Sequence, residues 1–230
     1  PPVDGVFQEY VAHEADLCFK LPDNVDTMEG ALIEPLAVGF HAANQGGAHI
    51  GQTAVVFGAG CIGLMSMMAL KAEGVGRVYV VDVMDKRLEK ARELGATVVI
   101  NSKKENVLDR INALTDGRGV DLCIETSGQE ICTRQAVDIS RKGATIVFVG
   151  YPASGEETLP VSKILDKELT FKSVFRYRHI YPMAIEAVAT GKVNVKGVVT
   201  NIFDFDDIQN AMDRSVNDKA DIVKSVVKIS

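Results

Sequence analysis

The sequence predicts a doubly wound α/β fold, with helices on both faces of a parallel β-sheet. Between residues 53 and 173, short β-branched runs alternate with stretches whose apolar residues recur at helical spacing. The short runs are continuously apolar, which is typical of strands buried on both faces. A glycine-rich turn, Gly58-Ala59-Gly60-Cys61-Ile62-Gly63, directly follows the first run. These three observations together indicate this fold class.

The elements follow from where each pattern changes. We expect strands at residues 53–57, 77–81, 97–100, 120–125, 144–149 and 169–173. Between them we expect helices at residues 62–73, 85–94, 107–114 and 131–139. In the second of these helices Leu88, Ala91 and Leu94 recur at helical spacing, and Gly95 stands where a helix-ending glycine belongs.

The two flanks have a different pattern. Strand-like pieces at residues 7–11 and 18–21 end at a breaker, Leu21-Pro22-Asp23-Asn24, and one or two helices interrupted by Pro35 are expected over residues 27–43. After Tyr181 we expect a helix ending near Gly191, a strand at 197–200, a helix at 206–215 and a strand at 222–229. Because neither flank can bury much alone, we interpret them as two halves of a second, incomplete domain.

Composition excludes several classes of function. A net charge of −6 without a basic run argues against a nucleic-acid partner. The uncharged stretch 53–70 is as long as a membrane span, but three glycines interrupt it, so no membrane partner is expected. The sequence lacks C-x-x-C and any histidine pair at metal-site spacing, and most of its cysteines lie among apolar neighbours. Reduced thiols predict a cytoplasmic protein.

The glycine turn matches G-x-G-x-x-G between a strand and a helix. Gly58 permits the tight turn, Gly60 lets the backbone approach a pyrophosphate, and Gly63 lets the helix pack closely on the sheet. The helix N-terminus then offers unpaired N–H groups to the phosphates. The turn alone is weak evidence, but here an acidic residue, Asp82, ends the next strand. The combination predicts a dinucleotide site.

Asp82 predicts which dinucleotide is bound. A carboxylate at this position accepts hydrogen bonds from the adenosine ribose hydroxyls and repels a 2′-phosphate, so NAD is the expected cofactor. Val83 and Met84 follow, without an adjacent cation for that phosphate. Arg87 has two interpretations, either a side chain over the adenine or a solvated helix residue paired with a carboxylate.

Several segments together resemble the medium-chain, zinc-dependent dehydrogenase/reductase family, in particular its sorbitol, xylitol and L-iditol dehydrogenases. The segments are Gly5-Val6-Phe7-Gln8-Glu9-Tyr10, Leu32-Ile33-Glu34-Pro35-Leu36-Ala37-Val38-Gly39, the glycine turn with Asp82, and Val174-Phe175-Arg176-Tyr177. Such enzymes have about a hundred more N-terminal residues, so the chain is expected to be N-terminally truncated. The resemblance implies residues 1–33 as the end of a GroES-like, β-rich catalytic segment, 34–176 as the NAD-binding domain, and 177–230 as the return to the catalytic domain.

The resemblance also implies roles for individual residues. Zinc would be held by a Cys and a His–Glu pair upstream of residue 1, with Glu34 beside the zinc or ligating it. Arg176 and Tyr177 would contact the polyol hydroxyls. NAD contacts are implied for Ile62, Asp82, Arg87, Val149, Gly150, Tyr151, Val174 and Phe175, beside the turn glycines Gly58, Gly60 and Gly63. Where relatives follow the Arg-Tyr with one residue and Asn-Thr-Tyr-Pro, this chain has Arg178-His179-Ile180-Tyr181-Pro182.

The residues themselves leave alternatives at two of these positions. Glu34 precedes Pro35 in an apolar stretch, so it is either a buried carboxylate that needs a partner or metal, or an N-terminal helix cap. Arg176 ends the sixth strand, at the edge where doubly wound sheets bind ligands, and is either a substrate contact or a salt bridge across the domain seam.

The expected function is a zinc-dependent dehydrogenase that transfers a hydride between NAD(H) and a polyol/ketose pair. The fragment alone is expected to be inactive. The alternatives are another medium-chain alcohol or threonine dehydrogenase, and a non-catalytic NAD-binding module. Relatives imply a homodimer or homotetramer, with residues 158–164 near the contact between sheets.

Overall fold

The computed structural model describes residues 5–218 and 220–229, and a six-stranded parallel sheet forms its main unit. The strands lie in the order β3-β2-β1-β4-β5-β6, and every neighbouring pair is parallel. The strand order reverses between β1 and β4, as in a doubly wound sheet, which confirms the predicted fold class. The strands are β1 (Thr53–Phe57), β2 (Arg77–Asp82), β3 (Val98–Asn101), β4 (Val120–Glu125), β5 (Ser140–Phe148) and β6 (Thr170–Ser173).

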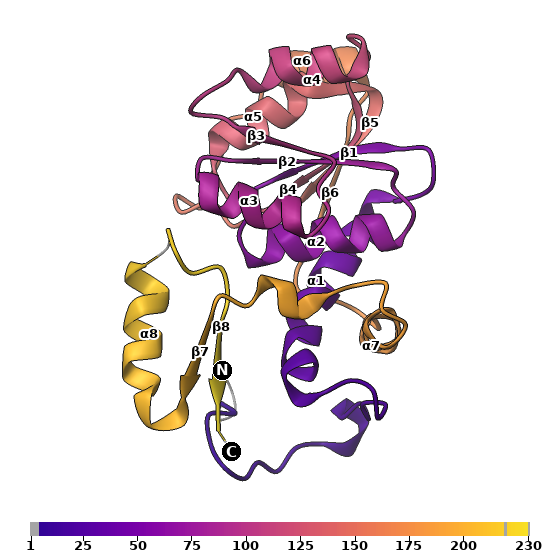
Figure 1. Cartoon of the computed structure of the whole chain (residues 1–230). Helices are drawn as coiled ribbons and strands as arrows, with labels where there is room; N and C mark the ends of the chain where they lie inside the picture. The colour runs from indigo at the N-terminus through magenta and orange to yellow at the C-terminus, as the bar shows by residue number, and fades with distance from the viewer. Residues whose placement is uncertain (1–4, 219, 230) are drawn as a thin grey trace.

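Helices cover both faces of this sheet (Figure 1). One layer holds α1 (Thr27–Gly46), α2 (Cys61–Ala72) and α3 (Asp85–Glu93), and the other holds α4 (Val107–Thr115), α5 (Glu130–Ile139) and α6 (Val161–Lys167). Successive strand residues point to opposite faces, so Val56 packs in the core under α2, whereas Val55 and Phe57 pack in the core under α5. The predicted helices between the strands are thereby confirmed.

Helix α1 is continuous, so the predicted interruption at Pro35 was wrong. A capping box starts the helix, because the Asp26 carboxylate accepts the Glu29 N–H while the Glu29 carboxylate accepts the Asp26 N–H, each at 2.9 Å. At Gly39, a Cβ atom would lie 2.7 Å from the Met65 carbonyl group, so α1 and α2 lie nearly backbone to backbone. This packing outweighs the hydrogen bond that Pro35 removes from the helix.

The N-terminal segment contains neither of the two predicted strands. Residues 5–20 are exposed, and their regular structure within the described range is a short 3₁₀ turn, Ala15–Leu17. Val6, Phe7 and Tyr10 have β propensity, but no neighbouring strand pairs with their backbone. A strand without a partner leaves its N–H and C=O groups unpaired, which is why the apolar pattern alone did not produce one.

The C-terminal segment forms a unit beside the sheet (Figure 1), and the apolar side chains of its residues 180–198 pack in the same core as α1 and α2. Helix α7 (Tyr181–Ala189) is as predicted, but the predicted strand at 197–200 is instead a 3₁₀ turn, Val195–Val198, because the Asn194 side chain accepts the Gly197 N–H. The strand begins later, as β7 (Asn201–Asp204), and pairs in parallel with β8 (Ser225–Lys228) beside α8 (Ile208–Asn217).

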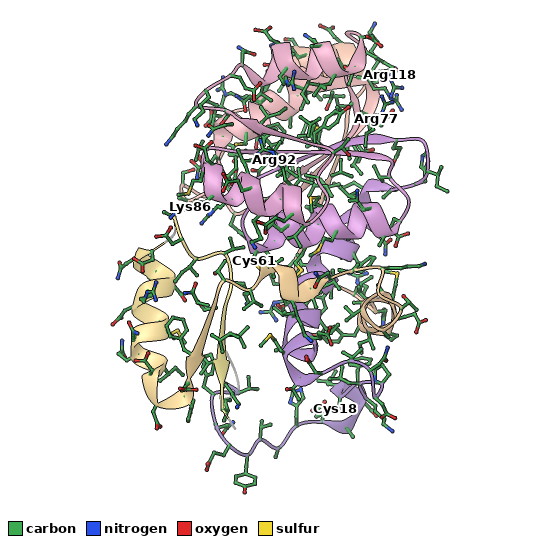
Figure 2. All side chains as sticks on the ribbon, in the orientation of Figure 1. Cys18, Cys61, Arg77, Lys86, Arg92 and Arg118 are labelled. Atoms are coloured by element: carbon green, nitrogen blue, oxygen red, sulfur yellow. The ribbon has the colours of Figure 1, made fainter. Side chains whose placement is uncertain are left out.

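An ion pair joins this unit to the sheet domain: the ammonium group of Lys86, on α3, contacts the Asp221 carboxylate (Figure 2). No helix within the described ranges combines the length and apolarity needed to cross a membrane. Of the predicted domain boundaries, the one between residues 33 and 34 falls inside α1. The boundaries remain a prediction.

Candidate nucleotide-binding site

A cleft of about 410 Å³ opens at the carboxyl ends of β1, β2 and β4. It lies where the strand order reverses, which is where doubly wound sheets bind ligands. Six of the residues predicted to contact the cofactor line it together: Gly58, Gly60, Ile62, Gly63, Asp82 and Arg87.

The backbone of the glycine turn explains why glycine is needed there. Gly58 has φ of 94°, a left-handed conformation that other residues rarely adopt. A Cβ atom on Gly63 would lie 1.8 Å from the Gly58 carbonyl oxygen, so α2 starts in direct contact with the turn. Gly60 is the N-cap of α2, which leaves the first N–H groups of that helix facing the cleft.

Asp82 is fixed by three backbone N–H groups. Its Oδ2 accepts the Ala59 N–H at 2.7 Å, and its Oδ1 accepts the Val83 and Met84 N–H groups at 2.7 and 2.9 Å. The carboxylate therefore links the end of β2 to the glycine turn and stays on the wall of the cleft. This geometry suits ribose hydroxyl groups, which can donate to its remaining lone pairs.

Arg87 lies across the same wall. The nearest atom to a Cβ built on Gly60 is the Arg87 Nη1, at 3.9 Å. Arg87 lines the cleft, and its two interpretations both remain predictions.

Nine lining residues were not among the predicted contacts: Cys61, Val81, Val83 and Met84, which adjoin the glycine turn or Asp82, and Ser102, Thr126, Ser127, Gln129 and Cys132. Four of them belong to the loop after β4 and to α5. The Thr126 hydroxyl donates to the Phe57 carbonyl oxygen at 2.7 Å, so this loop is docked on the end of β1. The predicted succession of strands and helices could have identified the loop after β4. This loop follows one of the two strands, β1 and β4, between which the strand order reverses.

The other predicted NAD contacts do not line this cleft. The N–H groups of Val149 and Gly150 donate to the Glu125 carbonyl oxygen at 2.8 and 3.0 Å, which docks the loop after β5 on the loop after β4. Tyr151 and Phe175 are exposed on the surface, whereas Val174 is buried at the end of β6. Their contact with NAD remains a prediction.

Glu34 lies on the exposed side of α1, near the middle of the helix. The expectations that it would be buried or would cap the helix were wrong, because α1 begins seven residues earlier, at Thr27, with Asp26 as its cap. Glu34 lines a second hollow of about 270 Å³ together with Phe19 and Tyr181. Burial, the Tyr177 hydrogen bond and the Glu34 charge together raise the pKa of Tyr181.

Tyr177 contacts Tyr181 at the second hollow, and Arg176 directly precedes Tyr177 in the chain. Arg176 is exposed, has φ of 59° and holds its guanidinium group 5.3 Å from the centre of the Phe175 ring. Among the described residues it forms no ion pair, so the predicted alternative of a salt bridge is not observed. The Tyr181 hydroxyl donates to the Tyr177 hydroxyl at 2.9 Å, and the two rings are in contact.

The described residues do not fit a zinc ion. No three His, Cys, Asp or Glu side chains within residues 5–218 and 220–229 come together as a metal site. All four cysteines are free, and burial raises the pKa of Cys61, of Cys132 and, to about 12, of Cys123, so these remain neutral thiols. Cys18 lies far from Cys61 (Figure 2).

The parallel sheet and the cleft around the glycine turn define a dinucleotide-binding Rossmann protein. The model of the family named zinc-binding dehydrogenase matches residues 61–190. The chain belongs to this family.

Two relatives show how much of such a protein the chain covers. It is 44% identical over its whole length to an uncharacterized zinc-type alcohol dehydrogenase-like protein of Escherichia coli, of which it covers 66%. It is 38% identical over 227 residues to the sorbitol dehydrogenase of Bacillus subtilis, covering 99% of this chain and 64% of that protein. The chain thus spans slightly less than two thirds of the curated relatives it matches.

A solved structure supports the cofactor assignment for the family. An alcohol dehydrogenase of Escherichia coli in complex with NADH superposes with a TM-score of 0.91 at 29% identity, covering 98% of this chain and 66% of that chain. NAD and zinc are thereby supported as cofactors of the family.

Proposed function

We propose that this chain is the cofactor-binding portion of a dehydrogenase that transfers a hydride between NAD(H) and a polyol/ketose pair. The observation that carries the proposal is the Asp82 carboxylate, fixed on the cleft wall by three N–H groups. When bound, NAD supplies the hydride acceptor. The polyol part rests on similarity to proteins named sorbitol dehydrogenase and D-xylulose reductase.

The residues of this chain have distinct parts in the proposal. The glycine turn and the N-terminus of α2 hold the pyrophosphate, and Asp82 holds the ribose. Val149, Gly150, Tyr151, Val174 and Phe175 are proposed to surround the nicotinamide end. Glu34, Arg176 and Tyr177 are proposed to face the polyol, because Glu34 and Tyr181 line one hollow, Tyr181 donates to Tyr177, and Arg176 directly precedes Tyr177.

We also propose that the protein is cytoplasmic and forms a homodimer or homotetramer. The free cysteines support the first point. The outer edge of β6 supports the second, because within the described residues no strand pairs with it on that side. Of the segment 158–164 expected near the contact, residues 161–164 belong to α6.

The test is oxidation of sorbitol, xylitol and L-iditol by the zinc-loaded, full-length protein, followed through NADH formation. Ethanol and L-threonine serve as the comparison substrates. Polyol oxidation that exceeds both supports the proposal. A preference for ethanol or threonine would mean that the substrate is another alcohol and not a polyol. NADH binding without turnover of any of these substrates would indicate a non-catalytic module.

A further inference from the structure

A buried carboxylate, the side chain of Glu125, lies at the carboxyl end of β4 and has no role in the proposed function. Its exposed fraction is 1%, which is rare for a glutamate. Burying a charge is costly unless hydrogen bonds replace the water that it loses. The hydrogen bonds of the Glu125 carboxylate therefore indicate which parts of the structure it holds in place.

The carboxylate collects the donors of the loop after β4. Its Oε1 accepts the Ser127 N–H at 2.8 Å and also the Ser127 hydroxyl, and its Oε2 accepts the Gly128 N–H at 3.0 Å. These donors precede the first turn of α5. The carboxylate thus sets the course of the loop whose Thr126, Ser127 and Gln129 line the cofactor cleft.

The same residue also holds the loop after β5. Its carbonyl oxygen accepts the N–H groups of Val149 and Gly150. The two loops touch without room for a side chain, since a Cβ on Gly150 would lie 2.2 Å from the Gly128 nitrogen and 2.8 Å from the Glu125 Oε2. The Glu125 carboxylate is thus hydrogen-bonded to the loop after β4 and lies directly against Gly150 of the loop after β5.

We propose that Glu125 is a positioning residue for the cofactor, and that its ionised form holds the loops after β4 and β5 in the arrangement that binds NADH. The proposal rests on the assignment of the cleft to NAD in the proposed function. It adds that the protonation state of a residue outside the cleft lining controls cofactor affinity.

Protonation would disturb this arrangement because a carboxylic acid is itself a donor. The group is surrounded by donors, so an added proton points at an N–H or O–H group and one hydrogen bond is lost. Burial raises the pKa of Glu125, although its hydrogen bonds with Ser127 and Gly128 oppose the shift, and the nearby charge of Glu157 raises the pKa further. The Cys132 thiol of α5 is also close and remains neutral.

The direction of the pH effect follows from these contacts. Lowering the pH through the raised pKa converts the carboxylate to the acid, so NADH affinity should fall as the pH falls. By linkage, bound NADH should in turn lower the pKa of Glu125. Removing the charge of Glu157 should lower the pKa of Glu125 and move the loss of affinity to lower pH.

The experiment is calorimetric titration of this chain with NADH at a series of pH values that starts at about pH 8 and falls through the raised pKa of Glu125. We expect the wild type to weaken by up to about tenfold across this range, which corresponds to about one lost hydrogen bond. Glu125→Gln should bind more weakly at pH 8 by a similar factor and lose the pH dependence. Glu157→Gln should match the wild type at pH 8, with its midpoint shifted to lower pH.

A Glu125→Gln variant with wild-type affinity or an unchanged pH midpoint would overturn the inference, even if its melting temperature falls. If that variant does not fold, Glu157→Gln decides, because an unshifted midpoint, or one shifted to higher pH, also overturns it. A wild-type chain that binds no NADH at all would overturn the proposed function and this inference together. A wild type that binds NADH with a flat pH profile would overturn the inference alone.

Discussion

The cofactor cleft and the exposed side formed by α1 and residues 175–181 differ in how firmly the chain holds their polar groups. In the cleft, Asp82 accepts three backbone N–H groups, and the neighbouring loop is docked on β1 through Thr126. On the exposed side, Glu34 and Arg176 have no hydrogen-bond partner among the described residues, and the nearby Tyr181 hydroxyl donates to the Tyr177 hydroxyl.

The chain therefore preorganises its cofactor site but not its proposed substrate side. Preorganised groups lose little freedom on binding, so mutations in the cleft should weaken cofactor binding directly. Mutations of exposed, unpaired groups should leave the isolated chain unchanged and show their effect in turnover alone.

Gly63→Ala should have the largest effect. Its Cβ would lie 1.8 Å from the Gly58 carbonyl oxygen, so the turn and α2 must separate. We expect a loss of stability of about 1–3 kcal/mol, typical of overpacking, and a fall in NADH affinity of about tenfold to a hundredfold. Gly76→Ala is the matched control, since nothing lies within 4 Å of its Cβ position. Equal melting curves and NADH titrations for the two variants would contradict the close packing of the turn.

Asp82→Asn should weaken NADH binding by about tenfold to a hundredfold, or about 1.5–3 kcal/mol, because the charge-assisted ribose bonds are lost. The amide nitrogen would also face an N–H donor of the turn. Asp85→Asn is the control, since it removes the same charge three residues later, outside the cleft lining. Calorimetry on both variants decides, and a similar loss of affinity in both would mean that overall charge rather than the ribose contact matters.

Arg176→Lys should leave the melting temperature and NADH affinity of the chain unchanged, because the side chain is exposed and forms no ion pair among the described residues. In the full-length enzyme, kcat and kcat/KM should fall together by about tenfold, since lysine lacks the guanidinium fork that donates to neighbouring hydroxyls. Arg77→Lys is the control, because Arg77 lies at the amino end of β2, whereas Arg176 follows the carboxyl end of β6. Normal kinetics with a lowered melting temperature would mean that Arg176 is structural.

The sheet domain could be predicted from the sequence because each of its signals is local. The strands β1 and β4 match the predicted ranges, and the G-x-G-x-x-G turn with Asp82 located one wall of the cleft. Buried parallel strands carry apolar runs whichever neighbours they have, so no knowledge of pairing is needed to find them.

The flanks could not be predicted because their structure depends on contacts that a local pattern does not encode. Pro35 remains inside a helix since Gly39 packs against α2, a contact between residues far apart in the sequence. The apolar residues near Phe7 have a strand-like pattern but no pairing partner within the described chain. Glu125 was missed for a related reason: its importance comes from loop N–H groups that converge on it after folding.

Asp82 should make this chain select NAD over NADP, and a direct comparison of the two cofactors measures that preference. Calorimetric titration of the wild-type chain with NADH and with NADPH, under the same conditions, measures the preference. The fixed carboxylate should repel a 2′-phosphate and bind the free hydroxyls, so NADH should bind at least about tenfold more tightly. Equal affinity for the two cofactors, or tighter binding of NADPH, would contradict the account.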